Sequence, residues 1–298
     1  MSLTNFNSFA IPGSIDIVEG QGKLPLIKVT NSFAEADIYL HGAHITRFDP
    51  KGEKGLLWMS DTSPFAQGKA IRGGIPICFP WFGAHRTNKD LPMHGFVRTR
   101  SWKLIETAQL SDGRSKVRLQ TVSDEESLKL WPHEFTLSMA FTIGTALEIA
   151  LTATNSGYEP LSYEDCFHTY FNISDLSKTL VSGLDGVGYI DKRKGDIRAV
   201  QSGDLRVQGD TVHLHVKAPS TSEVTDTPWA RRIRIDQQGM DETVVWNPGE
   251  AGSTSNPEMA GQWSNFLCVE SANCADDHIT LLPGTSHTSQ ARYSIEKL

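Results

Sequence analysis

Two apolar segments each carry one ionisable side chain that could take part in proton transfer. His168 lies in segment 166–171, where alternation along a strand places it on the same face as Tyr170. Glu270 lies at the end of segment 266–270, on a face that a strand would otherwise fill with apolar atoms. A histidine and a carboxylate on neighbouring strands are a natural acid and base. Residue type alone favours a simpler interpretation, a satisfied core histidine and a strand-end carboxylate.

The stretch 71–102 combines paired glycines, prolines and aromatic residues with the polar side chains Arg72, His94 and Arg98. Paired glycines allow backbone to approach backbone or ligand closely, and the prolines confine the segment to extended or turn geometry. The planar fork of arginine matches the oxygens of phosphate or carboxylate at two points. The stretch therefore predicts an anion-binding loop, and a structural loop whose arginines cap carbonyl groups is an equally good interpretation.

The composition excludes several classes of protein. Hydrophobic residues at 39% and charged residues at 21% of 298 residues are ordinary for a globular protein with a sizeable core. The net charge of −7, from 28 basic and 35 acidic side chains, favours neither a nucleic-acid partner nor an anionic membrane surface. An anionic ligand would have to be held by a local basic cluster.

The N-terminal segment and the cysteines indicate a cytoplasmic protein. Residues 1–18 lack the basic start and apolar run of a secretory signal, and no apolar stretch is long enough to span a bilayer. Cys78 and Cys268 have apolar neighbours on both sides, which favours reduced core thiols over disulfides or zinc ligands. Cys166 and Cys274 have mixed neighbours and indicate less.

Short alternating segments bounded by Gly, Pro, Asn or Asp dominate the chain, and this is the pattern of strands. Segment 161–173 is expected to be one strand, 175–186 a loop and 249–257 a functional loop. One short helix is predicted over 123–131, with an acidic first turn and a proline after it. Many strands with almost no helix predict an all-β fold, a large antiparallel sandwich formed by residues 1–298 as a single domain.

Several common functional motifs do not occur in the sequence. It has no Walker-type phosphate loop, no complete dinucleotide-binding glycine pattern and no Gly-x-Ser-x-Gly elbow. His213 and His215 would share one face of a strand, as a metal-binding pair would. No third ligand is evident, so a polar outer face is the better interpretation.

Taken together and in order, seven motifs resemble the hexose-6-phosphate mutarotases, the glucose-6-phosphate 1-epimerase branch of the aldose 1-epimerase family. The resemblance runs from about residue 38 to residue 282, and only 194–216 is weakly patterned. The motifs are Arg72-Gly73-Gly74-Ile75-Pro76, Phe79-Pro80-Trp81-Phe82-Gly83, His94-Gly95-Phe96-Val97-Arg98, Leu130-Trp131-Pro132, Phe167-His168-Thr169-Tyr170-Phe171, Val244-Val245-Trp246-Asn247-Pro248 and Val269-Glu270.

The resemblance implies a galactose-mutarotase-like β-supersandwich and an isomerase that interconverts the anomers of glucose 6-phosphate or related hexose 6-phosphates. It implies that His168 is the general acid at the ring oxygen and Glu270 the general base at the anomeric hydroxyl. Ordinary pKa values near 4.3 for Glu and 6.5 for His require His168 to be held partly charged, which a nearby Glu270 would favour. No metal or organic cofactor is implied.

The resemblance also implies a set of substrate-binding residues. Arg72 and Arg98 would contact the phosphate or the sugar, His94 would support or contact the substrate, and Asp210 would hydrogen-bond sugar hydroxyls. Trp81 is expected to offer an aromatic face to the sugar. The phosphosugar is the only partner expected, and the protein is predicted to be a monomer.

Three other functions remain open from the sequence. A carbohydrate-binding module would use Trp81 and Trp246 as stacking platforms and would not need a histidine facing a carboxylate. A sandwich-fold glycoside hydrolase normally uses two carboxylates, whereas one carboxylate has a histidine partner here. A mutarotase that has lost activity and senses sugar phosphate is the third.

Overall fold

The chain is built almost entirely of antiparallel strands, which confirms the predicted all-β class. The structure, a computed structural model, describes residues 3–259 and 261–298. Every strand pairing between the elements of these residues is antiparallel. The two α-helices of the described residues, α1 (Glu125–Leu130) and α2 (Gly249–Ser255), lie at the ends of strands rather than between two layers.

The strands form three main sheets and one ribbon. The N-terminal sheet has the order β1 (Ile15–Glu19), β2 (Pro25–Thr30), β3 (Ala34–Tyr39), β4 (His44–Pro50). The long sheet has the order β13 (Thr179–Ser182), β17 (Thr221–Asp226), β18 (Arg231–Gln238), β22 (Ser286–Lys297), β9 (Leu147–Asn155), β8 (Phe135–Ile143), β7 (Ser115–Val122), β6 (Lys103–Gln109). The site sheet has the order β15 (Ile197–Val200), β14 (Gly188–Asp191), β16 (Asp210–His215), β19 (Glu242–Pro248), β20 (Phe266–Asn273), β11 (Asp165–Phe167), β5 (Ile77–Cys78), and β12 (Tyr170–Asn172) also pairs with β20. The ribbon pairs β10 (Leu161–Tyr163) with β21 (Ile279–Leu281).

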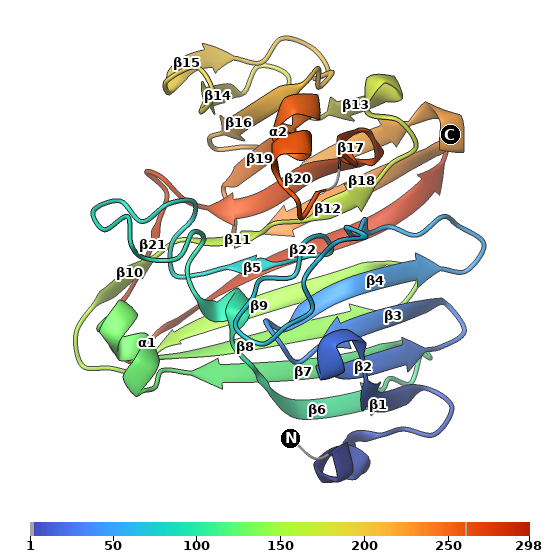
Figure 1. Cartoon of the computed structure of the whole chain (residues 1–298), viewed down its shortest axis with the longest axis vertical. Coiled ribbons are helices and arrows are strands. Elements are labelled where there is room, and N and C mark those ends of the chain that lie inside the picture. The colour runs from blue at the N-terminus through green and yellow to red at the C-terminus, as the bar shows by residue number, and fades with distance from the viewer. Residues whose placement is uncertain (1–2, 260) are drawn as a thin grey trace.

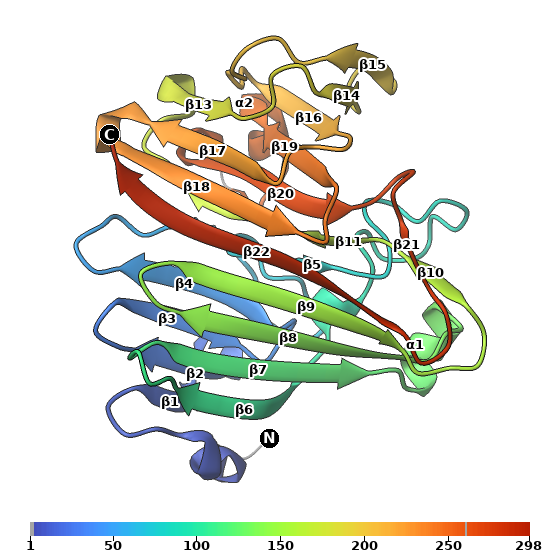
Figure 2. The same cartoon turned by 180° about the vertical axis from the view of Figure 1, so that it is seen from behind.

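The sheets are stacked as two layers. Figure 1 shows the N-terminal sheet and the site sheet side by side on one side of the molecule, and Figure 2 shows the long sheet on the other side. Strands β8 and β9 alternate strictly between buried and half-buried residues, so each gives one face to the interior. The largest core cluster draws on residues from Phe6 to Tyr293.

Strand β20 is the central element of the site sheet. All eight of its residues are buried, and it pairs with β19, β11 and β12. Alternation places Val245 of β19 and Val269 of β20 in the core between the layers. Val244 and Glu270 therefore face the opposite side of the sheet, where they line a cavity. The same alternation that builds the core sets the carboxylate into the cavity.

The structure corrects three local expectations. Segment 161–173 forms three short strands, because the amides of His168 and Tyr170 bond to the carbonyls of Pro76 and Gly74 instead of continuing one ladder. Segment 175–186 contains strand β13, and segment 249–257 contains helix α2. The predicted helix near 123–131 is confirmed as α1, which begins after the capping residue Asp124.

Arg231 joins the two layers at a fully buried position, and its substitution should be costly. Its guanidinium donates to the carbonyls of Lys54 and Asn172, lies 3.7 Å from buried Asp226, and packs 4.7 Å from the Trp229 ring. We expect Arg231→Met to lower the free energy of unfolding by ~3–5 kcal/mol, because it leaves a buried carboxylate and carbonyls without their partner. Urea unfolding measures this loss.

The neighbouring Arg232 provides the matched control for that measurement. It points to the other face of β18, is 40% exposed and pairs with Glu223 at 3.3 Å. We expect Arg232→Met to change stability by less than ~1 kcal/mol. Equal losses in the two variants would show that the Arg231 contacts are not the cause.

None of the helices in the described residues is long and apolar enough to cross a membrane.

Candidate active site

His168 and Glu270 face each other at the bottom of a cavity in the site sheet. His168 follows β11, Glu270 lies in β20, and His168 Nδ1 is 3.4 Å from Glu270 Oε1. Their side chains are 7% and 1% exposed, so the pair is shielded from bulk water. The structure thus brings together the two residues that the sequence predicts as acid and base.

Burial shifts the two groups in opposite directions. It lowers the pKa of His168 well below its ordinary value of 6.5, and His94, Arg98 and Arg72 lower it further through their charges. Burial also raises the pKa of Glu270 well above 4.5, while a hydrogen bond from Cys166 opposes that rise. Burial therefore favours the uncharged form of each group before substrate binds.

Aromatic side chains hold the His168 ring in place. Tyr170 stacks on it with ring centres 4.9 Å apart and an interplanar angle of 11°. Trp246 packs edge-on from one side at 5.4 Å, and His94 packs edge-on at the same distance. With these contacts, the imidazole has one orientation relative to the carboxylate.

The cavity has a volume of about 760 Å³ and an apolar floor with charged walls. The floor is formed by one side chain from each of four neighbouring strands, β20, β19, β16 and β14. These side chains are cross-strand partners in the order Glu270, Val244, Leu214, Ile190. The basic side chains that line the walls are Arg72, Arg86, Lys192, Arg193 and Arg198. Each of these basic side chains is paired with a carboxylate, and Glu164, Asp196 and Asp276 line the same walls. The volume suits a small polar ligand, and an anionic group on it would compete with these carboxylates for the basic side chains.

The glycine pair before the cavity allows two segments to touch through their backbones. Gly73 and Gly74 have φ values of 106° and 62°, which favour glycine. A Cβ at Gly73 would lie 2.5 Å from the Trp58 carbonyl oxygen, and one at Gly74 would lie 2.3 Å from that of Ile45. The close approach predicted from the sequence is confirmed, and it fixes the position of Arg72.

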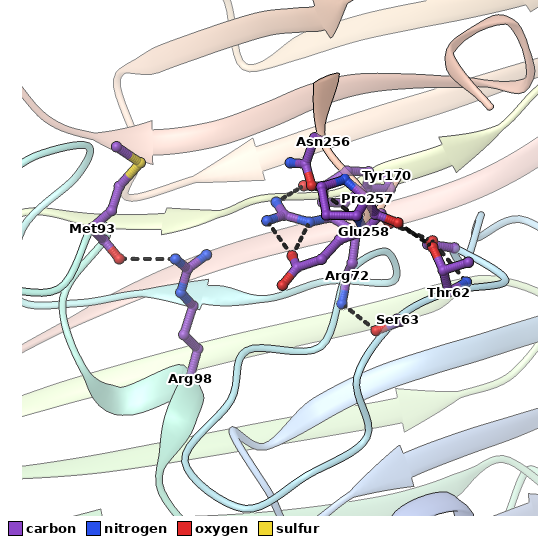
Figure 3. A network of polar contacts seen from close by, with 10 residues as sticks. Thr62, Ser63, Arg72, Met93, Arg98, Tyr170, Asn256, Pro257 and Glu258 are labelled. Carbon is purple, nitrogen blue, oxygen red and sulfur yellow. Dashed lines mark hydrogen bonds and ion pairs between the residues drawn. The ribbon is translucent and has the colours of Figure 1, made fainter. Parts of the chain in front are cut away.

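Arg72 lines the cavity with its guanidinium already held by two partners (Figure 3). Its Nε and Nη2 donate to Glu258 Oε2 at 3.2 and 2.8 Å, and its Nη1 donates to the Tyr170 hydroxyl at 3.0 Å. Glu258 follows helix α2, in a segment joined to the loop before Arg72 by the bond from Thr62 to the Pro257 carbonyl at 2.8 Å. An anion that reaches Arg72 must share it with the Glu258 carboxylate.

Arg98 lies apart from Arg72, as Figure 3 shows, and donates to the Met93 carbonyl at 2.9 Å. Burial lowers its pKa below the ordinary value. His94 lines the cavity with a positive φ of 65°, and its Nδ1 accepts a hydrogen bond from the Gly83 amide at 3.1 Å. Arg98 therefore supports the turn that presents His94, while its charge acts on His168 and Glu270.

Asp210 and Trp81 lie outside the residues that line this cavity. Asp210 begins β16, as predicted, and its Oδ1 accepts from Arg193 Nε at 2.7 Å, so it holds a wall residue. Trp81 is 6% exposed, donates to the Pro92 carbonyl at 2.9 Å and lines a smaller neighbouring cavity. Trp246 is the tryptophan that lines the cavity above the acid–base pair.

One set of side chains could offer ligand atoms to a metal ion. The donor atoms of His168, Cys268 and Glu270 lie within 4.8 Å of one another among the described residues. The charges of Arg72 and Arg98 act on the same place, and they disfavour a further cation. The surroundings suit an anion better than a metal.

His213 and His215 do not lie on the polar outer face that the sequence predicts for them. His213 and His215 lie on one face of β16, but that face is not a polar outer surface. His215 is fully buried, and Tyr189 stacks on His213 with ring centres 4.3 Å apart. Tyr189 of the neighbouring strand β14 covers this face, which sequence alternation could not show.

Comparison with known proteins identifies the family. The family model described as aldose 1-epimerase matches residues 25–294. The chain belongs to the aldose 1-epimerase family. It is therefore an enzyme of the isomerase class. An Escherichia coli K12 protein named "Putative glucose-6-phosphate 1-epimerase" is 35% identical over 271 residues, which are 90% of this chain and 90% of that protein.

Solved structures of similar proteins have the fold of this aldose 1-epimerase family member. The Salmonella typhimurium protein described as a "putative mutarotase (YeaD)" superposes with a TM-score of 0.90 at 30% identity, covering 97% of this chain and 96% of that chain. Galactose 1-epimerase from Lactobacillus acidophilus NCFM gives a TM-score of 0.74 at 14% identity, covering 95% and 99%. The galactose-mutarotase-like fold is confirmed.

Sequence reasoning missed three residues of this family member's site. Glu258 binds Arg72, Cys166 binds Glu270, and Glu164 binds Arg86 at 2.6 Å on the cavity wall. None of them lies in a pattern that predicts a partner, since each contact joins segments at least 78 residues apart. The one available signal was the position of Cys166 two residues before His168.

Proposed function

We propose that this enzyme interconverts the α and β anomers of glucose 6-phosphate, with His168 as general acid and Glu270 as general base. The observation that carries the proposal is the buried His168–Glu270 pair, 3.4 Å apart, in a cavity whose wall presents Arg72. The names of the E. coli and Salmonella relatives support the same activity. Related hexose 6-phosphates with a free anomeric hydroxyl fit the same chemistry.

The reaction needs one proton removed and one proton delivered. Glu270 takes the proton of the anomeric hydroxyl while His168 gives a proton to the ring oxygen, and the C1–ring oxygen bond breaks to form the open-chain aldehyde. Rotation about C1–C2 presents the other face of the carbonyl. Ring closure with the two roles reversed gives the other anomer and restores both groups, as general acid–base catalysis requires.

The substrate's phosphate can help to prepare the acid. The charges of Arg72 and Arg98 lower the pKa of His168 in the free protein. A phosphate of about −1.5 to −2 charge offsets these charges when it binds. The pKa of His168 then rises, and transfer of the proton from Glu270 to His168 becomes easier. A free hexose lacks this effect.

We also propose that the chain works as a monomer and a single domain in the cytoplasm, without a metal or organic cofactor. Free thiols at Cys78, Cys166, Cys268 and Cys274, all buried, suit a reducing compartment. The acid–base pair can carry out the proposed reaction without an electron or group carrier.

Anomer exchange measured by NMR tests the proposed function directly. Saturation transfer between the two anomeric protons of glucose 6-phosphate, and of glucose, gives exchange rates with and without the protein. We expect acceleration for glucose 6-phosphate well above that for glucose. Binding of glucose 6-phosphate without acceleration would favour the sensor, and no effect on either sugar would contradict the proposal.

The pH profile is a further expected result. Because the pKa of His168 lies below 6.5 and that of Glu270 above 4.5, kcat/KM should follow a bell. The rate falls in acid as the pair gains a second proton and falls in alkali as it loses its only one. The limbs belong to the coupled pair. A flat profile measured by the same exchange method, after subtraction of the spontaneous rate at each pH, would exclude the mechanism.

A further inference from the structure

The Glu270 carboxylate has a sulfur donor behind it. Cys166 Sγ donates to Glu270 Oε2 at 3.2 Å, while Oε1 lies on the side of His168. Among the described residues this is the one hydrogen bond that the Glu270 side chain receives. One oxygen is thus fixed from behind and the other faces the acid.

The thiol is held rigidly by its strand. Cys166 is fully buried in β11, which pairs with β20 on one edge and with β5 on the other. Its Cα lies opposite Ala272, two residues from Glu270, and opposite Cys78. This diagonal placement across an antiparallel pair brings side chains on one face within reach. The strand therefore holds the thiol beside the Glu270 carboxylate, with the Cys78 thiol as its other side-chain partner.

We propose that Cys166 is a positioning residue, whose thiol holds the Glu270 carboxylate so that Oε1 faces His168 and the substrate. The proposal rests on the proposed function in its kinetic part, whereas the state of Glu270 can be measured without turnover. The thiol is the donor in this bond whenever Glu270 is ionised, which is the form that acts as the base, because an ionised carboxylate only accepts.

A thiol suits this task better than stronger donors. An S–H group donates weakly, so it orients the carboxylate without making it a poor base. Burial keeps the pKa of Glu270 above its ordinary value, and the bond from Cys166 limits the rise. The other charged or titratable groups that act on Glu270 are Cys78 and Arg98, and His168 lies 3.4 Å from it. Burial and the Glu270 charge raise the pKa values of Cys268, Cys274, Tyr170 and Tyr293, so these nearby groups stay neutral.

The test compares Cys166→Ala with Cys166→Ser and with Cys274→Ala. Cys166→Ala removes the donor, Cys166→Ser replaces it with a stronger one, and Cys274→Ala removes an equally buried thiol that does not bond to Glu270. Anomer exchange of glucose 6-phosphate is measured against pH for all three. The infrared band of the Glu270 carboxyl, identified by subtraction of Glu270→Gln, is titrated in the same proteins.

We expect Cys166→Ala to lower kcat by roughly three- to tenfold with little change in KM, as for loss of one modest hydrogen bond. Its infrared titration and its alkaline kinetic limb should move up by about half to one pH unit. Cys166→Ser should have a kcat between those of Cys166→Ala and the wild type, and its infrared titration and alkaline limb should lie below the wild-type values. Cys274→Ala should leave kcat and both pH values unchanged.

An unchanged Glu270 titration in Cys166→Ala, or equal kinetic losses in Cys166→Ala and Cys274→Ala, would overturn the proposal. If the wild-type protein shows no exchange while the carboxyl titration shifts as expected, the proposed function fails and the positioning contact stands.

Discussion

His168→Ala and Glu270→Gln should each slow the enzymatic anomer exchange of glucose 6-phosphate by about 10²–10⁴-fold, the contribution typical of general acid–base catalysis. Either change leaves one proton transfer without a partner at a buried site where water cannot replace it. Exchange by NMR, with the spontaneous rate subtracted, measures the loss. Calorimetric titration should still detect sugar-phosphate binding, because Arg72 and the cavity walls remain.

Two surface substitutions separate loss of chemistry from loss of structure. His287 binds the Gly239 carbonyl at 2.7 Å and Glu148 pairs with Arg114 at 3.2 Å, both away from the cavity. His287→Ala and Glu148→Gln should keep wild-type exchange. If His168→Ala or Glu270→Gln retained near-wild-type turnover, the role given to that residue would be wrong.

Arg72→Ala should reduce kcat/KM for glucose 6-phosphate by about tenfold or more, because charge-assisted hydrogen bonds contribute roughly 1.5–3 kcal/mol. Free glucose never uses that contact, so its much slower exchange should change little. Glu258→Gln should act in the opposite direction and lower KM for the phosphosugar, since Glu258 occupies the guanidinium at 2.8 Å in the free protein. The two sugars are compared side by side for each variant.

Substitutions of Arg98 and Arg118 are the controls for Arg72→Ala. Arg98 bonds to the Met93 carbonyl, so Arg98→Ala should affect both sugars through the turn that carries His94. Arg118 pairs with Glu106 at 2.9 Å on the long sheet, and Arg118→Ala should affect neither sugar. Equal losses on both sugars in Arg72→Ala would mean that Arg72 supports its loop, and the phosphate contact would have to be sought elsewhere.

Strand alternation is a local property of the chain, so the sequence could predict which face of its strand carries His168 and which carries Glu270. It placed His168 with Tyr170, and the two rings do stack. It could not show that segment 161–173 breaks into three strands, since that depends on which distant carbonyls accept its amides. The glycine pair at 73–74 was informative for the same local reason, as its backbone angles favour glycine.

Contacts between segments that are far apart in the chain could not be predicted from the sequence. Helix α2 has the sequence Gly-Glu-Ala-Gly-Ser-Thr-Ser, whose glycines and serines favour loops, and it packs against β16 and β19. Glu258, which follows it, therefore gave no sign that it would meet Arg72, 186 positions earlier. Arg98 and Asp210 were predicted as ligand contacts from resemblance, and the structure gives them protein partners at the edge of the cavity.

The central place of β20 has a consequence for how the protein is made. Strands β5, β11, β12 and β19 are all synthesised before β20, yet three of them pair with it directly. While the ribosome is still translating residues before 266, the catalytic base does not exist and these strands have an open edge. Such an edge is a site for pairing with other chains, and non-local pairing of this kind is slow. We therefore expect nascent chains that lack β20 to depend on chaperones, and the site to form only after this late strand has been added.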